Sequence, residues 1–164
     1  MASKKKDQQI KVQIANNFTG LKISPSKTKK LIDTVFDHLP EAKTSEIIIS
    51  IAIVDDTEIR KLNRKFLNHR SKTDCLSFDL SDTHSPGSPK IFELVVNGQM
   101  AVRQANLRGH SPQAELALYI THGLLHNLGF DDSSDSKAKK MHETEDKILQ
   151  QLGYGLVYNK NTKQ

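Results

Sequence analysis

The chain has few of the residue types that stabilise small secreted proteins or span membranes. Its 164 residues include one cysteine, Cys75, so an internal disulfide and a disulfide-stapled scaffold are excluded. No segment approaches the roughly 20 consecutive apolar residues of a membrane-spanning helix. The lysine-rich start is not followed by the apolar run of a signal peptide. We therefore expect a cytoplasmic protein without a membrane or disulfide partner, whose cysteine is a reduced thiol in a buried strand.

Aromatic residues are also scarce, whereas cations are plentiful and unevenly distributed. No tryptophan, three tyrosines and six phenylalanines leave few surfaces on which RNA bases can stack. Residues 1–72 contain 15 Lys and Arg against 8 Asp and Glu, while residues 73–164 contain 9 against 11. This distribution makes the first half the candidate RNA face, bound through phosphates and RNA shape. Ordinary solvated cations are the alternative, because a net charge of +5 alone proves no nucleic-acid binding.

The segment from His122 to Asp132 has the spacing of a metal site. His122 and His126 are four residues apart, so on a helix both imidazoles lie on the same face. Gly129 suits the left-handed position that ends a helix and lets Asp132 return as a third ligand. Three protein ligands leave a position open for water or substrate, which is typical of a catalytic zinc site. An isolated pair of histidines would more often be unrelated to metal; the glycine and the aspartate favour a site.

The same segment lacks the catalytic carboxylate of a peptidase. The spacing of His122 and His126 is that of the H-E-x-x-H metalloproteases, but Gly123 stands where those enzymes have glutamate. Glycine cannot take a proton from water or pass one to a leaving amine. The ligand frame is therefore present without the peptidase general base.

The ligand set predicts one divalent ion per chain. Zinc is the first choice for two imidazoles and a carboxylate, while manganese, nickel and iron are alternatives. Asp131 competes with Asp132 for the ligand position, and the turn after the helix favours Asp132. We assign a catalytic role to His122 through the water that the ion would activate.

Five motifs, in the same order along the chain, resemble the YbeY family of bacterial endoribonucleases, the rRNA maturation factors. The metal segment resembles the family motif H-G-x-L-H-L-x-G-[YF]-D-H, with Asp132 at the position of its third histidine. The other matching segments are Asp55 to Asn63, Lys72 to Phe78, Glu93 to Val96, and Met141 to Glu145. Gly109-His-Ser ahead of Glu115-Leu116 also fits the family, and the resemblance covers about residues 10–155.

The chain also departs from this family. An arginine to which the resemblance assigns a catalytic role falls at Leu67, and Arg70 is a candidate substitute or simply a solvated loop charge. Asp79 replaces a proline, and Phe92-Glu93 replaces Gly-Asp. None of these changes alters the predicted metal ligands.

The resemblance implies a metal-dependent endoribonuclease that cuts single-stranded RNA in 16S rRNA maturation and ribosome quality control. Its partners would be rRNA in the small ribosomal subunit, and ribosomal or assembly proteins. One alternative is a non-catalytic assembly or RNA-binding factor with a structural metal. This alternative stays open because Leu67 stands where the resemblance implies a catalytic arginine. A metallopeptidase-like hydrolase is the other alternative, which Gly123 disfavours. The candidate RNA-binding cations are Arg60, Lys61, Arg64, Lys65, Arg70 and Lys72.

For several other polar residues we expect a structural or solvent-exposed position instead of a role in the site. We expect His84 to be exposed in a turn-rich loop, His110 to be a loop histidine and not a ligand, and His142 to face solvent. Asp74 and Ser77 would either orient substrate beside the site or form hydrogen bonds within the fold.

Hydrophobic periodicity predicts alternating strands and helices. The expected strands cover residues 10–14, 46–54, 76–80 and 91–96, with 46–54 covered on both faces. The expected helices cover residues 25–39, 57–66, 98–107, 112–128 and 136–152. The buried stripe of the first helix would contain Leu31, Ile32, Val35 and Phe36.

These elements predict one α+β domain over residues 9–155. A four-stranded sheet would pack with about five helices, one of which bears the metal site. The resemblance implies a sheet of mixed direction and a metalloprotease-like fold. We expect residues 1–8 and 156–164 to be flexible.

Overall fold

A mixed four-stranded sheet forms the centre of the molecule in the computed structural model, which describes residues 9–39, 46–68, 73–82, 84–85, 87–155 and 157. The strands are β1 (Gln9–Asn16), β2 (Glu46–Val54), β3 (Cys75–Asp79) and β4 (Lys90–Asn97). The helices are α1 (Pro25–His38), α2 (Asp56–Leu67), α3 (Gly98–Arg108), α4 (Pro112–Asn127) and α5 (Asp135–Gln151). The predicted α+β class, with four strands and five helices, is confirmed.

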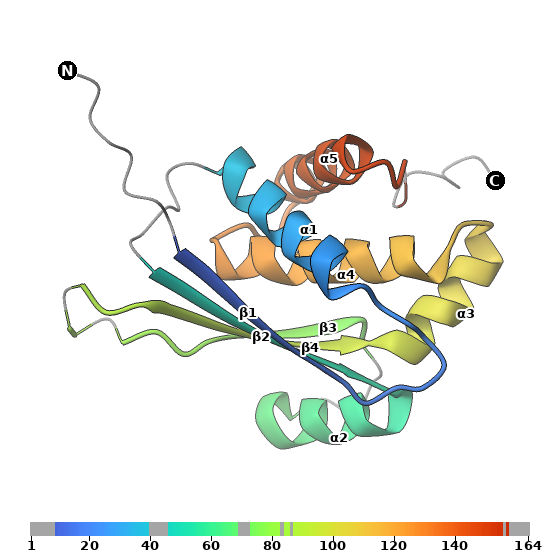
Figure 1. Cartoon of the computed structure of the whole chain (residues 1–164), viewed down its shortest axis with the longest axis horizontal. Coiled ribbons are helices and arrows are strands. Elements are labelled where there is room, and N and C mark those ends of the chain that lie inside the picture. Colours follow the sequence, from blue (N-terminus) through green and yellow to red (C-terminus); the bar gives the residue numbers. More distant parts are fainter. Residues whose placement is uncertain are drawn as a thin grey trace.

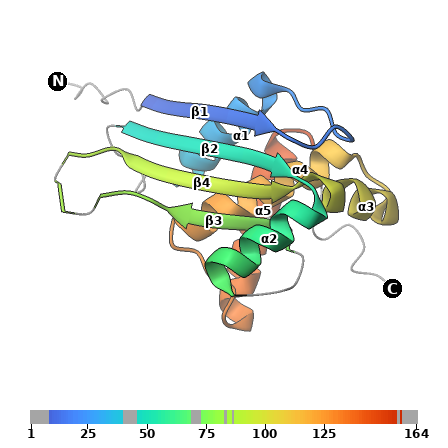
Figure 2. The same cartoon turned by 90° about the horizontal axis from the view of Figure 1, so that it is seen from below.

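The strand order in the sheet is β1-β2-β4-β3. The pairs β1 with β2 and β2 with β4 are parallel, and β3 is antiparallel to β4. Figure 2 shows this order with α2 in front of the strands. The sheet is therefore mixed, as the resemblance implies, and β3 forms the edge nearest to the metal-site helix.

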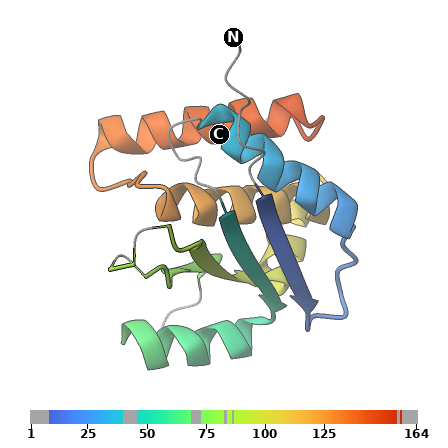
Figure 3. The same cartoon turned by 60° about the vertical axis from the view of Figure 1, so that its left-hand side comes forward.

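Helices α1, α4 and α5 cover one face of the sheet, and α2 lies against the other (Figure 1). Helix α4 lies between the sheet and α5, so most of its residues from Ala114 to Leu125 are buried (Figure 3). The predicted stripe of α1 is confirmed, because its four apolar residues are at most 2% exposed. The site-bearing helix is thus held from several sides.

One expectation about β2 was wrong. Ile47, Ile49 and Ile51 are buried, but Ile48 and Ser50, which alternate with them, are only partly buried. The second face of the sheet is covered by one short helix, α2, among the described residues, so the apolar run is fully buried on one face only.

The expected flexible ends fall almost wholly outside the described residues. Residues 1–8 and 158–164 are among those not described. Within the expected tail, the structure describes Val157, whose apolar side chain is 1% exposed and belongs to the main core. In the part of the chain that the structure describes, no helix has the length and apolar character needed to cross a membrane.

Candidate metal centre and adjoining cleft

Helix α4 ends in the turn that the sequence predicts. Gly129 has a φ of 97°, which is the left-handed conformation that glycine adopts without strain. The Phe130 amide donates a 2.9 Å hydrogen bond to the Leu125 carbonyl and closes the helix end. This reversal brings the following loop, with Asp132, back toward His126.

The structure brings His122, His126 and Asp132 together as predicted. One possible ligand atom from each residue lies within 4.8 Å of the others, and the two Nε2 atoms are 3.0 Å apart. Two nitrogens at 2.0–2.1 Å from a tetrahedral ion would be separated by about 3.3 Å, so the spacing is close to that of ligands. The histidines are partly buried and Asp132 is exposed, so the cluster lies at the surface end of the helix.

The second ring nitrogen of each histidine has a protein partner. His122 Nδ1 lies 2.7 Å from Glu145 Oε1, and His126 Nδ1 lies 3.1 Å from the Phe130 carbonyl oxygen. Donation through Nδ1 fixes the ring orientation and leaves Nε2 as the electron-pair donor. The donor set therefore fits a divalent metal ion.

The sequence interpretation missed the role of Glu145. Its side chain is completely buried, and on α5 it lies in line with the buried Met141, Ile148 and Leu149. A carboxylate is costly in such an apolar stripe unless it is paired. This position in the stripe was the signal that Glu145 bonds to another functional residue.

The surroundings of His122 shift its pKa. Burial alone lowers this pKa, but the hydrogen bond and negative charge of Glu145 outweigh burial, with further contributions from Asp74 and Asp132. The pKa therefore lies above its ordinary value of 6.5. Protons consequently compete with a metal ion for His122 more effectively than they do for a solvated histidine.

His142 corrects the expectation of a solvent-facing side chain. It is partly buried, and its Nδ1 lies 3.1 Å from Glu145 Oε2. Its ring is stacked on His122 with 6.5 Å between centroids. Glu145 therefore holds two imidazoles side by side, because each of its oxygens accepts from a different histidine.

Asp131 has local partners instead of a place in the cluster. Its Oδ1 accepts hydrogen bonds from the Ser133 amide and hydroxyl, at 3.0 and 2.7 Å, and Lys137 Nζ lies 3.4 Å from Oδ2. These hydrogen bonds, those of Ser133 foremost, lower the pKa of Asp131. Of the two neighbouring aspartates, Asp132 is the one that joins the histidines.

Gly123 packs directly against the sheet. A Cβ atom at this position would lie 2.6 Å from Cys75 Sγ, 3.0 Å from Leu94 Cδ2 and 3.3 Å from Ser77 Oγ. The first of these distances is too short for any side chain unless the Cys75 side chain, β3 or α4 moves. The site consequently has no room for a peptidase glutamate at position 123, and the side chain of Ser77 faces the helix.

A cleft of about 350 Å³ adjoins the metal cluster. It runs from the start of β3 across α3 and α4 to α5, and it contains Asp74, one of the two residues considered as substrate-orienting. Its lining residues are Thr73, Asp74, Met100, Gln104, Arg108, Glu115, Leu118, Tyr119, His122, His142 and Glu145. Of the three candidate ligands, His122 is the one that lines this cleft.

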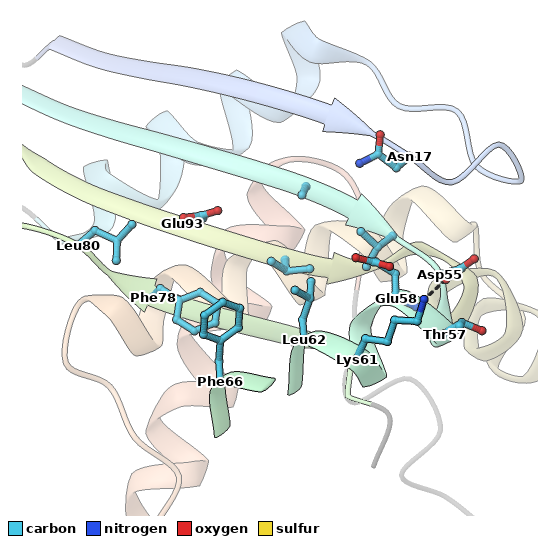
Figure 4. A pocket seen from close by; sticks show the side chains of 13 residues that line it. Asn17, Asp55, Thr57, Glu58, Lys61, Leu62, Phe66, Phe78, Leu80 and Glu93 are labelled. Atoms are coloured by element: carbon cyan, nitrogen blue, oxygen red, sulfur yellow. Dashed lines mark hydrogen bonds between the residues drawn. The ribbon is translucent and has the colours of Figure 1, made fainter. Parts of the chain in front are cut away.

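The candidate RNA-binding cations of α2 lie elsewhere. Arg60, Lys61, Arg64 and Lys65 are exposed on α2, across the sheet from α4. Lys61 lines a separate hollow of about 780 Å³ between α2 and the sheet, where the Phe66 and Phe78 rings meet edge to face at 5.7 Å (Figure 4). Arg70 and Lys72 lie outside the described residues, so their roles stay predictions.

Replacing Glu145 by glutamine is expected to weaken metal binding by about 10- to 100-fold at neutral pH, because the ring of His122 loses a charged acceptor. Below the raised pKa of His122, protons displace the metal, so affinity falls as the pH falls. Without the carboxylate that pKa drops, so the variant's affinity should begin to fall only at a lower pH.

Metal titrations between pH 5 and 8 measure both effects of Glu145→Gln. Glu143→Gln, at an exposed position on the same helix, is the matched control and should behave as the wild type. Equal affinity and an equal pH midpoint in all three proteins would contradict the role of Glu145.

Comparisons with known proteins agree with the fold and with the family resemblance. A family model described as Endoribonuclease YbeY matches residues 13–153. A protein named Endoribonuclease YbeY from Thermodesulfovibrio yellowstonii is 30% identical over 155 residues, covering 87% of this chain and 98% of that protein. One of the same name from Myxococcus xanthus is 36% identical over 118 residues, covering 71% of this chain and 40% of that protein.

A solved structure has the same fold. The solution structure of a Thermotoga maritima protein aligns with a TM-score of 0.56 at 22% identity, covering 86% of this chain and 88% of that one. The family model spans most of the domain, including His122, His126 and Asp132, and the Thermodesulfovibrio relative covers 87% of the chain. The chain therefore belongs to the YbeY family of endoribonucleases.

Proposed function

We propose that the chain is a metal-dependent endoribonuclease that cuts single-stranded rRNA in the cytoplasm, in 16S rRNA maturation and ribosome quality control. The observation that carries the proposal is the cluster of His122, His126 and Asp132 beside an open cleft in a member of this family. Its partners would be rRNA of the small subunit and ribosomal or assembly proteins.

The cluster would hold one divalent ion per chain, with zinc as first choice and manganese, nickel or iron as alternatives. When bound, the ion supplies a Lewis acid that polarises a phosphoryl oxygen and stabilises the charge that develops during cleavage. The protein's part is to hold His122 in one orientation through Glu145, and both of these residues also line the cleft. Gly123 has no group with which to move a proton.

Two observations favour RNA over a peptide as substrate. Position 123 has no carboxylate and no room for one, so the proton transfers of peptide hydrolysis lack their usual agent. Relatives over most of the chain are named endoribonucleases. RNA brings its own nucleophile, the 2′-hydroxyl beside the scissile phosphate, whose proton would pass to solvent or to a residue other than Gly123.

A substrate comparison tests the proposal. Metal-loaded protein is incubated with a single-stranded 16S rRNA fragment, with the same fragment annealed to its complement, and with unfolded casein. We expect cleavage of the single strand, much slower cleavage of the duplex and none of casein. Cleavage of casein with RNA left intact would contradict the proposal.

Leu67 supports a second candidate function, a ribosome-assembly factor that binds RNA without cutting it. Leu67 is 49% exposed on α2 and has no charge, where the family resemblance implies a catalytic arginine. Tight binding of the single strand by the metal-loaded protein, with no cleavage in the presence of any of the four metals, would favour this function over the nuclease.

A further inference from the structure

The cleft beside the metal cluster has a charge balance that is unfavourable for a polyanion. Three carboxylates line it, those of Asp74, Glu115 and Glu145. Among the described residues that line it, Arg108 is the single Lys or Arg. In the described part of the chain, a phosphate that enters this cleft therefore has one fixed protein cation to approach, in addition to a bound metal ion.

Arg108 is held in place by a completely buried carboxylate. Its Nη1 donates to Glu115 Oε1 at 3.1 Å, and its side chain is 31% exposed. His110 contacts the other oxygen of Glu115, and burial together with the nearby carboxylate raises the pKa of Tyr119, so its hydroxyl stays a neutral donor to Glu115. Arg108, His110 and Tyr119 thus all contact the carboxylate of Glu115. Because its negative charge is shared among them, Glu115 neutralises the positive charge of the Arg108 guanidinium only in part.

The junction of two helices fixes the position of this pair. Arg108 is the last residue of α3, and Glu115 lies in the first turn of α4. Between them Gly109 has a φ of 73° and donates to the Ala105 carbonyl at 2.9 Å, so the chain turns sharply. The guanidinium is therefore presented by packed backbone and not by a loose loop.

We propose that Arg108, positioned by Glu115, binds a phosphate of the RNA strand in the cleft next to the ion held by His122. This inference rests on the proposed function. A guanidinium carries five N–H donors in a planar fork, so a group anchored through Nη1 can direct others to phosphate oxygens. Arg108 then supplies a cation at the cleft, whereas Leu67 on α2, at the position of the family arginine, supplies none.

Arg108→Gln tests the proposal, with Arg103→Gln as the matched control. Arg103 lies on the same helix and also pairs with a carboxylate, at 3.0 Å from Asp56, but it does not line the cleft. For Arg108→Gln we expect kcat/KM on the single-stranded rRNA fragment to fall about 10- to 100-fold, the loss expected for one charged hydrogen bond. Arg103→Gln should change kcat/KM by less than about threefold, which is within the range usual for surface substitutions.

Binding of short RNA to the metal-free protein, followed by fluorescence anisotropy over a salt series, gives a second readout that needs no catalysis. Loss of one phosphate contact should reduce the slope of log K against log salt by about 0.7 in Arg108→Gln. Equal slopes and equal kcat/KM for Arg108→Gln and Arg103→Gln would overturn the proposal. If the wild type cuts no RNA, the proposed nuclease function fails, while the anisotropy comparison still decides the role of Arg108.

Glu115→Gln distinguishes positioning from simple folding. It should raise KM through a less ordered Arg108, and combined with Arg108→Gln it should cause little further loss, because both changes remove the same interaction. In the double variant no carboxylate remains at position 115, so it also lacks the unpaired buried charge that Arg108→Gln alone would leave. Fully additive losses in kcat/KM, with all variants folded by circular dichroism, would overturn the positioning role of Glu115.

Discussion

His126→Ala is expected to lose the bound metal ion and to lower RNA cleavage by about 10³-fold or more, since a metal ion contributes several kcal/mol to stabilising the transition state. The two remaining ligands, His122 and Asp132, lie on different segments and cannot by themselves hold an ion in a fixed geometry. In the fold, His126 Nδ1 contacts the Phe130 carbonyl and Nε2 contacts His122 Nε2, and the loss of one such hydrogen bond costs about 1 kcal/mol. The variant should therefore stay folded.

His84→Ala is the matched control for this experiment. His84 is exposed, as the sequence predicts, and lies in the loop between β3 and β4. Metal content by mass spectrometry, circular dichroism and initial cleavage rates are measured on the three proteins. Full cleavage by a metal-free His126→Ala would show that this histidine does not hold a catalytic ion.

Gly123→Glu is expected to destabilise the fold by about 3–5 kcal/mol, the range for an uncompensated buried charge, with overpacking against β3 in addition. The first side-chain atom already meets Cys75 Sγ at 2.6 Å and Leu94 Cδ2 at 3.0 Å, so the Cys75 side chain, α4 or β3 must move. For a chain of this size the midpoint of thermal unfolding should fall by about 6–20 °C. The change that would restore a peptidase motif therefore breaks the packing.

Two further variants isolate the steric part of this effect. Gly123→Ala should lower the free energy of unfolding by about 1–3 kcal/mol through overpacking. The higher helix propensity of alanine should offset about 1 kcal/mol of this loss. Adding Cys75→Ala removes the nearest atom and should recover part of that loss. Gln113→Glu, at an exposed position on the same helix, controls for the added charge. Unchanged unfolding midpoints, or peptidase activity in a stable Gly123→Glu, would contradict this account of position 123.

The helix of the metal site was predictable because its signals are local. The spacing of His122 and His126 fixes their common face, and Gly129 marks the turn whatever surrounds it. The place of Asp132 beside the two histidines followed from that turn. Element positions were predictable for the same reason, since periodicity reports which side of each segment is buried.

Partners distant in sequence were not predictable. The bond between His122 and Glu145 joins two helices, and the packing of Gly123 on Cys75 depends on where β3 lies in the sheet. His142 was assigned to solvent because its charged neighbours on α5 suggested exposure, whereas the adjacent Glu145 is buried. Strand order, which sets these contacts, is a property of the whole fold and leaves little trace in any one segment.

Reconstitution of metal-free protein tests whether one bound ion per chain is needed for RNA cleavage. The protein is stripped with a chelator, zinc is returned in steps to two equivalents, and bound metal and cleavage of the single-stranded rRNA fragment are measured in the same samples. We expect a rate that rises in proportion to bound metal and levels at one ion per chain. Cleavage at an undiminished rate by the metal-free chain, or one bound ion with no cleavage for zinc, manganese, nickel and iron alike, would contradict it.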